Sequence, residues 1–92
     1  MFSYELSKKL LKKTKKLANK DPVLATIFFK KTQEVISRDN ITISVYKNLK
    51  SPQNEYKRIH LTDNFILLFH VDLNKNHIVF VDILHWDFAY KK

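Results

Sequence analysis

Two of the four histidines stand where an imidazole ring could carry out acid–base chemistry. His60 follows Tyr56 and Arg58 in an alternating run, and side chains two positions apart on a strand share one face. His85 comes directly after a long apolar run, where a strand is expected to end and its side chains to meet solvent. Imidazole titrates near neutral pH, and arginine donates charge-assisted hydrogen bonds to phosphate. Cleavage of RNA through the 2′-hydroxyl group needs a base, an acid and a cation, so these residue types fit that reaction.

Each of these histidines also has a structural interpretation, as a partly buried, hydrogen-bonded residue. His70 and His77 flank an expected hairpin turn, where contact with solvent is enough to account for them. A metal site is a further alternative, in which His60 and His85 would be joined by an aspartate. No short ligand spacing such as HxxxH occurs, so the pattern predicts neither a metal nor another cofactor. The aspartates considered are Asp63, Asp82 and Asp87.

The composition excludes several other kinds of site. Cysteine is absent, which excludes a disulfide framework, a thiol nucleophile and a thiolate zinc site. Glycine is absent as well, which excludes the P-loop and the dinucleotide fingerprint because both need backbone without a Cβ atom close to phosphate. Any contact with phosphate must therefore come mainly from side chains.

Positive charge is concentrated at the N-terminal end of the chain. The 92 residues include 17 basic and 9 acidic side chains, a formal net charge of +8. Residues 1–20 hold seven lysines and one glutamate, which makes +6 of that total. Such a field favours a polyanion such as RNA, although a lysine-rich helix face can also be simply solvated. The lysines predicted to contact RNA are Lys9, Lys12, Lys13, Lys16, Lys47, Lys50 and Lys57.

Hydrophobic periodicity predicts the strands that position these residues. Alternation over residues 2–6 and 56–61 is typical of strands, and alternation over 41–46 predicts a further strand or an extended arm. The continuous apolar runs 65–69 and 78–84 predict strands that are covered on both faces.

Capping residues predict two helices between the strand at residues 2–6 and the segment at residues 41–46. Ser7 and Asp21 are the expected N-caps, with Pro22 in the first turn of the second helix. The first helix is expected to end on a left-handed Asn19, and asparagines in the turn at 72–76 replace the usual glycine.

The order β-α-α-β-β-β-β predicts an α+β fold, with one domain over residues 1–92. The N-terminal strand and a helical hairpin would pack on one face of an antiparallel sheet, because short turns join the last three strands. The predicted core residues include Leu10, Leu17, Leu24, Phe28, Phe29, Phe65, Leu67, Phe69, Val79, Phe80 and Val81.

Four stretches of the second half have a recognisable order and spacing. They are Tyr46-Lys47-Asn48-Leu49-Lys50, Tyr56-Lys57-Arg58-Ile59-His60-Leu61, Asn64-Phe65-Ile66-Leu67-Leu68-Phe69 and the ending Leu84-His85-Trp86-Asp87-Phe88-Ala89-Tyr90-Lys91. Together they resemble the RelE/ParE toxin superfamily, and most of all its YafQ-like and archaeal RelE-like branch. The N-terminal β-α-α order also fits, so the resemblance covers essentially the whole chain and implies a RelE-like fold.

The resemblance implies the toxin of a type II toxin–antitoxin pair. Toxins of this branch are ribonucleases that enter the ribosome and cut mRNA by attack of a 2′-hydroxyl group, without a metal. A cognate antitoxin would bind the toxin in a hetero-oligomer and block it. The chain has no apolar segment that approaches the ~20 residues of a membrane span and no signal-peptide pattern, so we expect a cytoplasmic protein with no membrane partner.

The resemblance also implies roles for individual residues. His60 and His85 match histidines of the branch, and the second of these acts as an acid or base there. Asp87 matches the aspartate of the terminal motif, and Tyr90 matches an aromatic residue that packs at the substrate. Lys47 stands where YafQ-like enzymes have another catalytic histidine, so that role could pass to lysine.

Two further positions depart from the relatives, and two alternatives stay open. Asn64 aligns with a catalytic aspartate, and Ile66 falls where RelE proper has an arginine that stabilises the transition state. The first alternative is a ParE-like inhibitor of DNA gyrase on the same fold, against which the histidines argue because that activity needs no acid–base pair. The second is a catalytically inactive module that binds RNA or an antitoxin.

Overall fold

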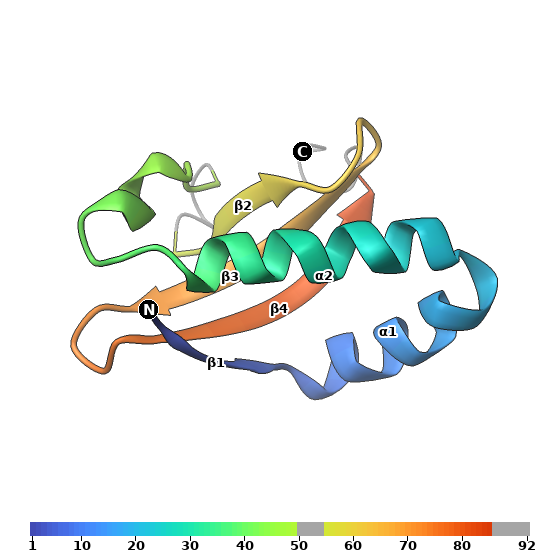
Figure 1. The fold of residues 1–92 in the computed structure, drawn as a ribbon, viewed down its shortest axis with the longest axis horizontal. Helices are drawn as coiled ribbons and strands as arrows, with labels where there is room; N and C mark the ends of the chain where they lie inside the picture. The colour runs from blue at the N-terminus through green and yellow to red at the C-terminus, as the bar shows by residue number, and fades with distance from the viewer. Residues whose placement is uncertain (50–54, 86–92) are drawn as a thin grey trace.

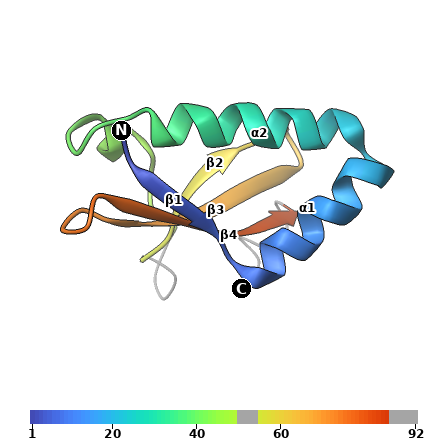
Figure 2. The same cartoon turned by 60° about the horizontal axis from the view of Figure 1, so that its bottom comes forward.

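The computed structural model describes residues 1–49 and 55–85. Two helices pack on one face of a four-stranded sheet (Figure 1, Figure 2). The strand order is β1-β4-β3-β2, with β1 parallel to β4 and the other neighbours antiparallel. The predicted α+β class is confirmed, and the parallel N-terminal strand makes the sheet mixed. The elements are β1 (Ser3–Leu6), α1 (Lys8–Lys20), α2 (Pro22–Ile36), the short 3₁₀ helix η1 (Thr42–Val45), β2 (Lys57–His60), β3 (Phe65–Asp72) and β4 (His77–His85).

Both predicted helix N-caps are confirmed. The Ser7 hydroxyl accepts a hydrogen bond from the Leu10 amide at 3.1 Å, and the Asp21 carboxylate accepts one from the Leu24 amide at 3.0 Å. The predicted left-handed Asn19 is wrong, because α1 continues to Lys20. Asp21 both closes α1, through its amide, and caps α2, so the turn between the helices needs no left-handed residue. The left-handed asparagine in the described chain is Asn76, with φ of 53°, in the β3–β4 turn.

The predicted strand at residues 41–46 is also wrong, since this segment contains the 3₁₀ helix η1. The Asp39 carboxylate accepts hydrogen bonds from the amides of Ile41 and Thr42, at 2.9 and 2.7 Å, and these bonds close a turn. They also lower the pKa of Asp39, with the contacts to Thr42 the largest cause. Ile43 and Tyr46, three residues apart, are the buried positions, which is the spacing of a 3₁₀ helix.

The main core lies between the helices and the sheet. Six of its predicted members are buried there, and Leu17 and Phe65 pack against them from partly exposed positions. The prediction of Val79 is wrong, because its neighbours Ile78 and Phe80 point toward the helices, whereas Val81 packs, partly buried, against a smaller cluster on the other face of the sheet. In a continuous apolar run, the sequence does not show which side chains point to which face of the sheet. A β-bulge beside Leu68 changes the alternation of side chains between the two faces as well. The buried predicted residues are Leu10, Leu24, Phe28, Leu67, Phe69 and Phe80.

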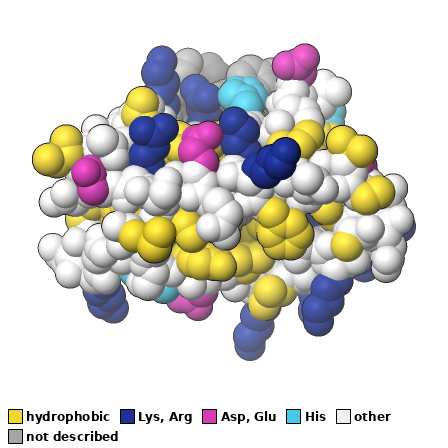
Figure 3. Space-filling view, in the orientation of Figure 1, with side chains coloured by type: hydrophobic (Ala, Val, Ile, Leu, Met, Phe, Trp, Pro, Cys, Tyr) yellow, Lys and Arg dark blue, Asp and Glu magenta, His cyan; other side chains and the backbone are white. Residues whose placement is uncertain are grey.

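Phe29 is the other error in the predicted core, since 58% of it is exposed on the flank of α2. Apolar side chains are visible in a band below α2, with lysines and arginines projecting above and below that band (Figure 3). The helix-free face of the sheet has a smaller apolar cluster of its own, formed by Leu49, Ile66 and Leu68. Among the described residues, no helix has the length and apolar character needed to cross a membrane.

Candidate functional site

The register of β2 places Arg58 and His60 on the helix-free face of the sheet. Ile59 lies between them and belongs to the core beneath the helices, so its two neighbours point the other way. Arg58 pairs with Leu68 of β3, and His60 pairs with Ile66. His60 is exposed, whereas Arg58 is half-buried with its Nε atom shielded from solvent.

Residues 47–49 extend the sheet beyond β2 and bring Lys47 to the same place. The Arg58 amide donates to the Lys47 carbonyl at 3.0 Å, and the Leu49 amide donates to the Tyr56 carbonyl at 2.9 Å. Lys47 therefore lies opposite Arg58, on the same face, and its side chain is exposed. We call Lys47, Arg58 and His60 the β2 cationic site.

Tyr46, the residue that precedes this segment, is anchored to α2 and to the residues that follow α2. Its hydroxyl donates to the Glu34 carboxylate of α2 at 2.5 Å and accepts from the Arg38 Nε at 3.3 Å. Its ring packs edge-on against Phe69, with 5.5 Å between ring centroids. Burial and then the bond to Glu34 raise the pKa of the Tyr46 hydroxyl, while Tyr46 in turn raises the pKa of Arg38. The tyrosine thus stays protonated and fixes the start of residues 47–49 against α2.

Lys57, for which a contact with RNA is predicted, makes two hydrogen bonds within the fold. Its ammonium donates to the Tyr46 carbonyl and to the Asn48 side-chain oxygen, both at 3.0 Å. Lys57 alternates with Arg58, so it points away from the β2 cationic site. It therefore serves to hold residues 46–48 against β2.

His85 lies at the same end of the sheet as His60 but emerges on the other face. It pairs with Phe65 of β3, and the two rings meet edge-on with centroids 5.4 Å apart. Phe65 packs against the core beneath the helices, whereas the partner of His60, Ile66, belongs to the opposite cluster. The structure therefore places the two predicted catalytic histidines, His60 and His85, on opposite faces of the sheet.

Two of the four predicted RNA-binding lysines of α1 form ion pairs with the buried carboxylate of Asp82. Lys13 contacts Asp82 at 2.6 Å and also donates to the Ile83 carbonyl at 3.0 Å. Lys9 contacts the other oxygen of Asp82 at 3.1 Å, while Lys12 and Lys16 are exposed. Asp82 is only 5% exposed, so Lys9 and Lys13 neutralise a charge inside the fold. A lone acid within an apolar strand, in a chain with one lysine-rich helix, is the signal that could have predicted this pairing.

Three predicted site residues lie outside the described residues: Lys50, Asp87 and Tyr90. Within the part of the chain that the structure describes, no group of three or more histidine, cysteine, aspartate or glutamate residues could hold a metal. No pattern in the sequence indicated the contacts of His77, which joins Ser3 at 2.7 Å and Glu5 at 2.9 Å. These two bonds hold β1 against the start of β4.

The chain matches no family model, but it has clear relatives. A protein of Methanocaldococcus jannaschii named "Putative toxin RelE4" is 36% identical over 92 residues, which is 100% of this chain and 94% of the relative. The structure of YafQ from E. coli strain BL21(DE3) has a TM-score of 0.71 at 18% identity, over 98% of this chain and 99% of that one. A chain of the heterotetrameric YoeB-YefM toxin–antitoxin complex of Staphylococcus aureus has a TM-score of 0.69 at 15% identity, over 89% and 93% of the two chains.

The two helices on one face of a four-stranded mixed sheet are the α+β architecture of the RelE-like fold. Identity of 36% over the full length of the chain goes further than the shared fold, and the chain belongs to the RelE toxin family. The resemblance inferred from the sequence is confirmed at this level.

Proposed function

We propose that this protein is the toxin of a type II toxin–antitoxin pair and that it cleaves mRNA on the ribosome, in the cytoplasm. Membership of the RelE toxin family supports the role as a toxin. The observation that carries the nuclease proposal is the β2 cationic site, where backbone pairing puts Lys47 opposite Arg58 and alternation puts His60 beside it. A base and two cations then lie on one face that no described helix covers.

In the proposed reaction, the scissile phosphate lies against the β2 cationic site. His60 accepts the proton of the 2′-hydroxyl group, whose oxygen forms a bond to phosphorus. The bond from phosphorus to the 5′-oxygen breaks, and Lys47 donates a proton to that oxygen as it leaves. Arg58 holds the charge that develops on the phosphate oxygens. The products are a 2′,3′-cyclic phosphate and a 5′-hydroxyl group, and the reaction uses no metal.

This assignment replaces the pairing of two histidines that the sequence suggested. Because His85 emerges on the other face, the proposal gives it no proton to move at the same phosphate. Asp87 and Tyr90 lie outside the described residues, so their implied roles stay predictions. The exposed lysines of α1, Lys12 and Lys16 among them, would add contacts to ribosomal RNA.

The proposal includes an antitoxin that binds this protein in a hetero-oligomer and blocks it. The support is the shared fold with a chain of the YoeB-YefM toxin–antitoxin complex. A positive net charge of +8 favours a partner with an acidic surface. Co-purification of this chain with the product of a neighbouring small acidic gene would test the partnership directly.

Induced expression in a bacterium separates the nuclease from the two rival activities. We expect growth arrest together with new 5′ ends inside translated mRNAs, and no change in plasmid supercoiling. Arrest with relaxed or broken DNA and intact mRNA would favour a ParE-like inhibitor of gyrase. Normal growth with the protein present and folded would favour an inactive binding module.

A further inference from the structure

A pocket of about 310 Å³ opens at the end of the sheet where α1 turns into α2. Each of four elements contributes one apolar wall: Leu17 from α1, Leu24 from α2, Phe65 from β3 and Ile83 from β4. Leu24 and Ile83 are buried, whereas Leu17 and Phe65 pack against the core from partly exposed positions. These four side chains are hydrocarbon, so the walls that they form offer a ligand no hydrogen-bonding group.

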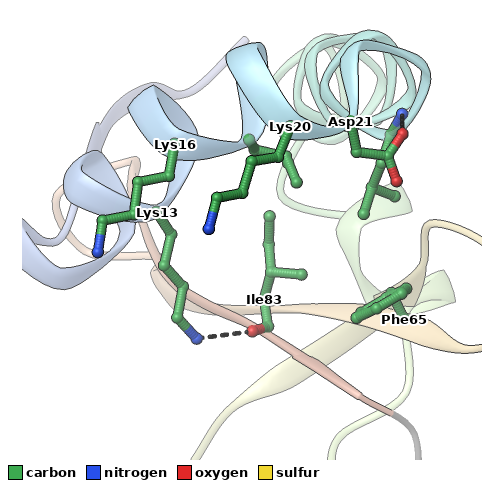
Figure 4. Close-up of a pocket in the computed structure, with 8 residues that line it drawn as sticks. Lys13, Lys16, Lys20, Asp21, Phe65 and Ile83 are labelled. Carbon is green, nitrogen blue, oxygen red and sulfur yellow. Dashed lines mark hydrogen bonds between the residues drawn. The ribbon is translucent and has the colours of Figure 1, made fainter.

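Lysines of α1 form one rim of this pocket. Figure 4 shows Lys13, Lys16 and Lys20 projecting from the helix toward the sheet. Lys13 is paired with Asp82, but Lys16 and Lys20 are exposed and form no ion pair with the residues that the structure describes. The acid at the rim, Asp21, accepts the hydrogen bond that caps α2. We call this feature the lysine-rimmed pocket, because it is apolar at its floor and positively charged along one edge.

The size and the walls of the pocket limit the kind of ligand that it can hold. Its volume equals that of about ten water molecules at ~30 Å³ each, which is the room that about ten non-hydrogen atoms need. A nucleobase carries donors and acceptors on its edges, and burying them against apolar walls without hydrogen bonds is unfavourable. An aliphatic chain has no polar group to desolvate, and burying its surface is favourable. The pocket therefore favours an aliphatic occupant.

We propose that the lysine-rimmed pocket binds a small amphipathic anion, a free monocarboxylate with an aliphatic chain of about eight to ten carbons. The chain would lie against the four apolar walls, and the carboxylate would lie at the rim beside Lys16 and Lys20. A ligand that touches four elements of the native fold would also stabilise it against unfolding. The inference goes beyond the proposed function and does not rest on it, since the pocket and the β2 cationic site lie on different faces of the sheet.

The direct test is isothermal titration calorimetry of the full chain with decanoate, at neutral pH and below the concentration at which decanoate forms micelles. Hexanoate is the control with the same charge and a shorter chain, and decyltrimethylammonium is the control with the same chain and the opposite charge. We expect saturable binding of one decanoate per chain and a higher melting temperature in its presence. Hexanoate should bind at least about 30-fold more weakly, because four CH₂ groups are no longer buried. Decyltrimethylammonium should bind at least about tenfold more weakly, because its charge is repelled by the lysines.

Variants of the protein then locate the bound decanoate. Leu17→Trp fills the pocket from a partly exposed position of α1, so circular dichroism should show a folded protein and binding should fall by about tenfold or more. Lys16→Ala with Lys20→Ala should weaken binding by roughly 3- to 10-fold. The matched control is Lys8→Ala with Lys15→Ala, two exposed lysines of the same helix that do not line the pocket.

Each outcome of these titrations decides the proposal. Absence of decanoate binding to wild type, or undiminished binding to folded Leu17→Trp, would overturn it. Equal losses in the two lysine pairs would also overturn it, because attraction to the general charge of α1 would then account for the binding. If Leu17→Trp does not fold, the comparison of the two lysine pairs and the titration with hexanoate still decide between these outcomes.

Vesicles distinguish a free anion from the surface of an acidic membrane. The probe is a set of phosphatidylcholine vesicles with and without phosphatidylglycerol, to which binding of the protein is measured by flotation. We expect the two lysine pairs to have equal effects on flotation, because a charged surface attracts all exposed lysines of α1 alike. Flotation that depends on Leu17, Lys16 and Lys20, without binding of decanoate, would assign the pocket to a lipid surface and overturn the proposal of a free ligand.

Discussion

Two regions of this molecule are rich in positive charge, and they use it differently. Helix α1 has seven lysines in 13 residues, yet Lys9 and Lys13 neutralise the buried Asp82. The β2 cationic site has only two cations, Lys47 and Arg58, beside His60, and backbone pairing places all three on the face of the sheet that no described helix covers. The number of charges would favour α1 as the site of phosphate binding, whereas the arrangement of side chains favours β2 as the site of RNA cleavage.

Helix α1 has two rows of lysines with different surroundings. The inner row lies beside Asp82 and the apolar pocket formed by Leu17, Phe65 and Ile83, and consists of Lys9, Lys13, Lys16 and Lys20. The outer row is exposed to solvent, and consists of Lys8, Lys12 and Lys15. We therefore expect the inner row to affect stability or partner binding and the outer row to affect long-range attraction of RNA.

The largest expected effect comes from the β2 cationic site. Arg58→Ala and Lys47→Ala should each lower the rate of mRNA cleavage by roughly 10²–10⁴-fold, because they remove charge stabilisation or a proton donor from the transition state. Circular dichroism should show a folded protein in both cases. Cleavage rates within a few-fold of wild type for both variants would contradict a catalytic site on β2 and would favour one formed by the terminal motif that includes His85.

The next effect is the loss of a counter-ion inside the fold. Lys13→Ala leaves Asp82, which is 5% exposed, with Lys9 as its remaining ion-pair partner among the described residues. We expect a loss of about 1–3 kcal/mol in the free energy of unfolding, measured with urea. Lys12→Ala is the matched control on the same helix and should change stability by less than about 0.5 kcal/mol. Equal effects of the two substitutions would mean that the inner row is no more structural than the outer one.

Tyr46 gives a smaller effect with a defined dependence on pH. Tyr46→Phe removes the hydrogen bond to Glu34 and should lower the free energy of unfolding by about 0.5–1.5 kcal/mol at neutral pH. The folded state raises the pKa of this hydroxyl, so its contribution is complete below the unfolded pKa of about 10 and is lost as pH rises through the folded value. The difference between wild type and Tyr46→Phe should therefore shrink in strong alkali. A difference that stays constant with pH would contradict the anchoring role.

The outer lysine row should have the smallest effect on the fold. Replacing Lys8, Lys12 and Lys15 by alanine should leave stability nearly unchanged, yet make RNA binding less dependent on salt. The slope of log affinity against log salt concentration should fall by about 0.7 for each phosphate that a lysine no longer neutralises. Titrations at several salt concentrations measure this slope. An unchanged slope would mean that the outer row is a solvated face alone.

Much of this fold follows from local pattern. The caps at Ser7 and Asp21, both helices and the three antiparallel strands rest on interactions between residues close in sequence. The errors arise where a local pattern is ambiguous. Residues 41–46 alternate like a strand, but the Asp39 carboxylate draws their backbone into a 3₁₀ turn.

The candidate site was less predictable, because it depends on interactions between distant parts of the chain. Arg58 and His60 could be placed on one face from the sequence, since they lie on one strand. The face on which His85 emerges could not be predicted, because the apolar run before it does not show which of its side chains face the helices. The bulge beside Leu68 also changes the register between the two strands. The use of Lys9 and Lys13 inside the fold depends on Asp82, which is about 70 residues away in the sequence.

The most direct test of the central claim is cleavage by the purified protein of mRNA bound to ribosomes, compared between His60→Ala and His70→Ala. His70 is a matched control, a histidine on the neighbouring strand β3 that is only partly exposed and lies outside the β2 cationic site. We expect wild type and His70→Ala to leave 2′,3′-cyclic phosphate and 5′-hydroxyl ends, and His60→Ala to cleave at least about 100-fold more slowly. Absence of cleavage by folded wild-type protein, or equal rates for the two histidine variants, would contradict the assignment of His60 as the base.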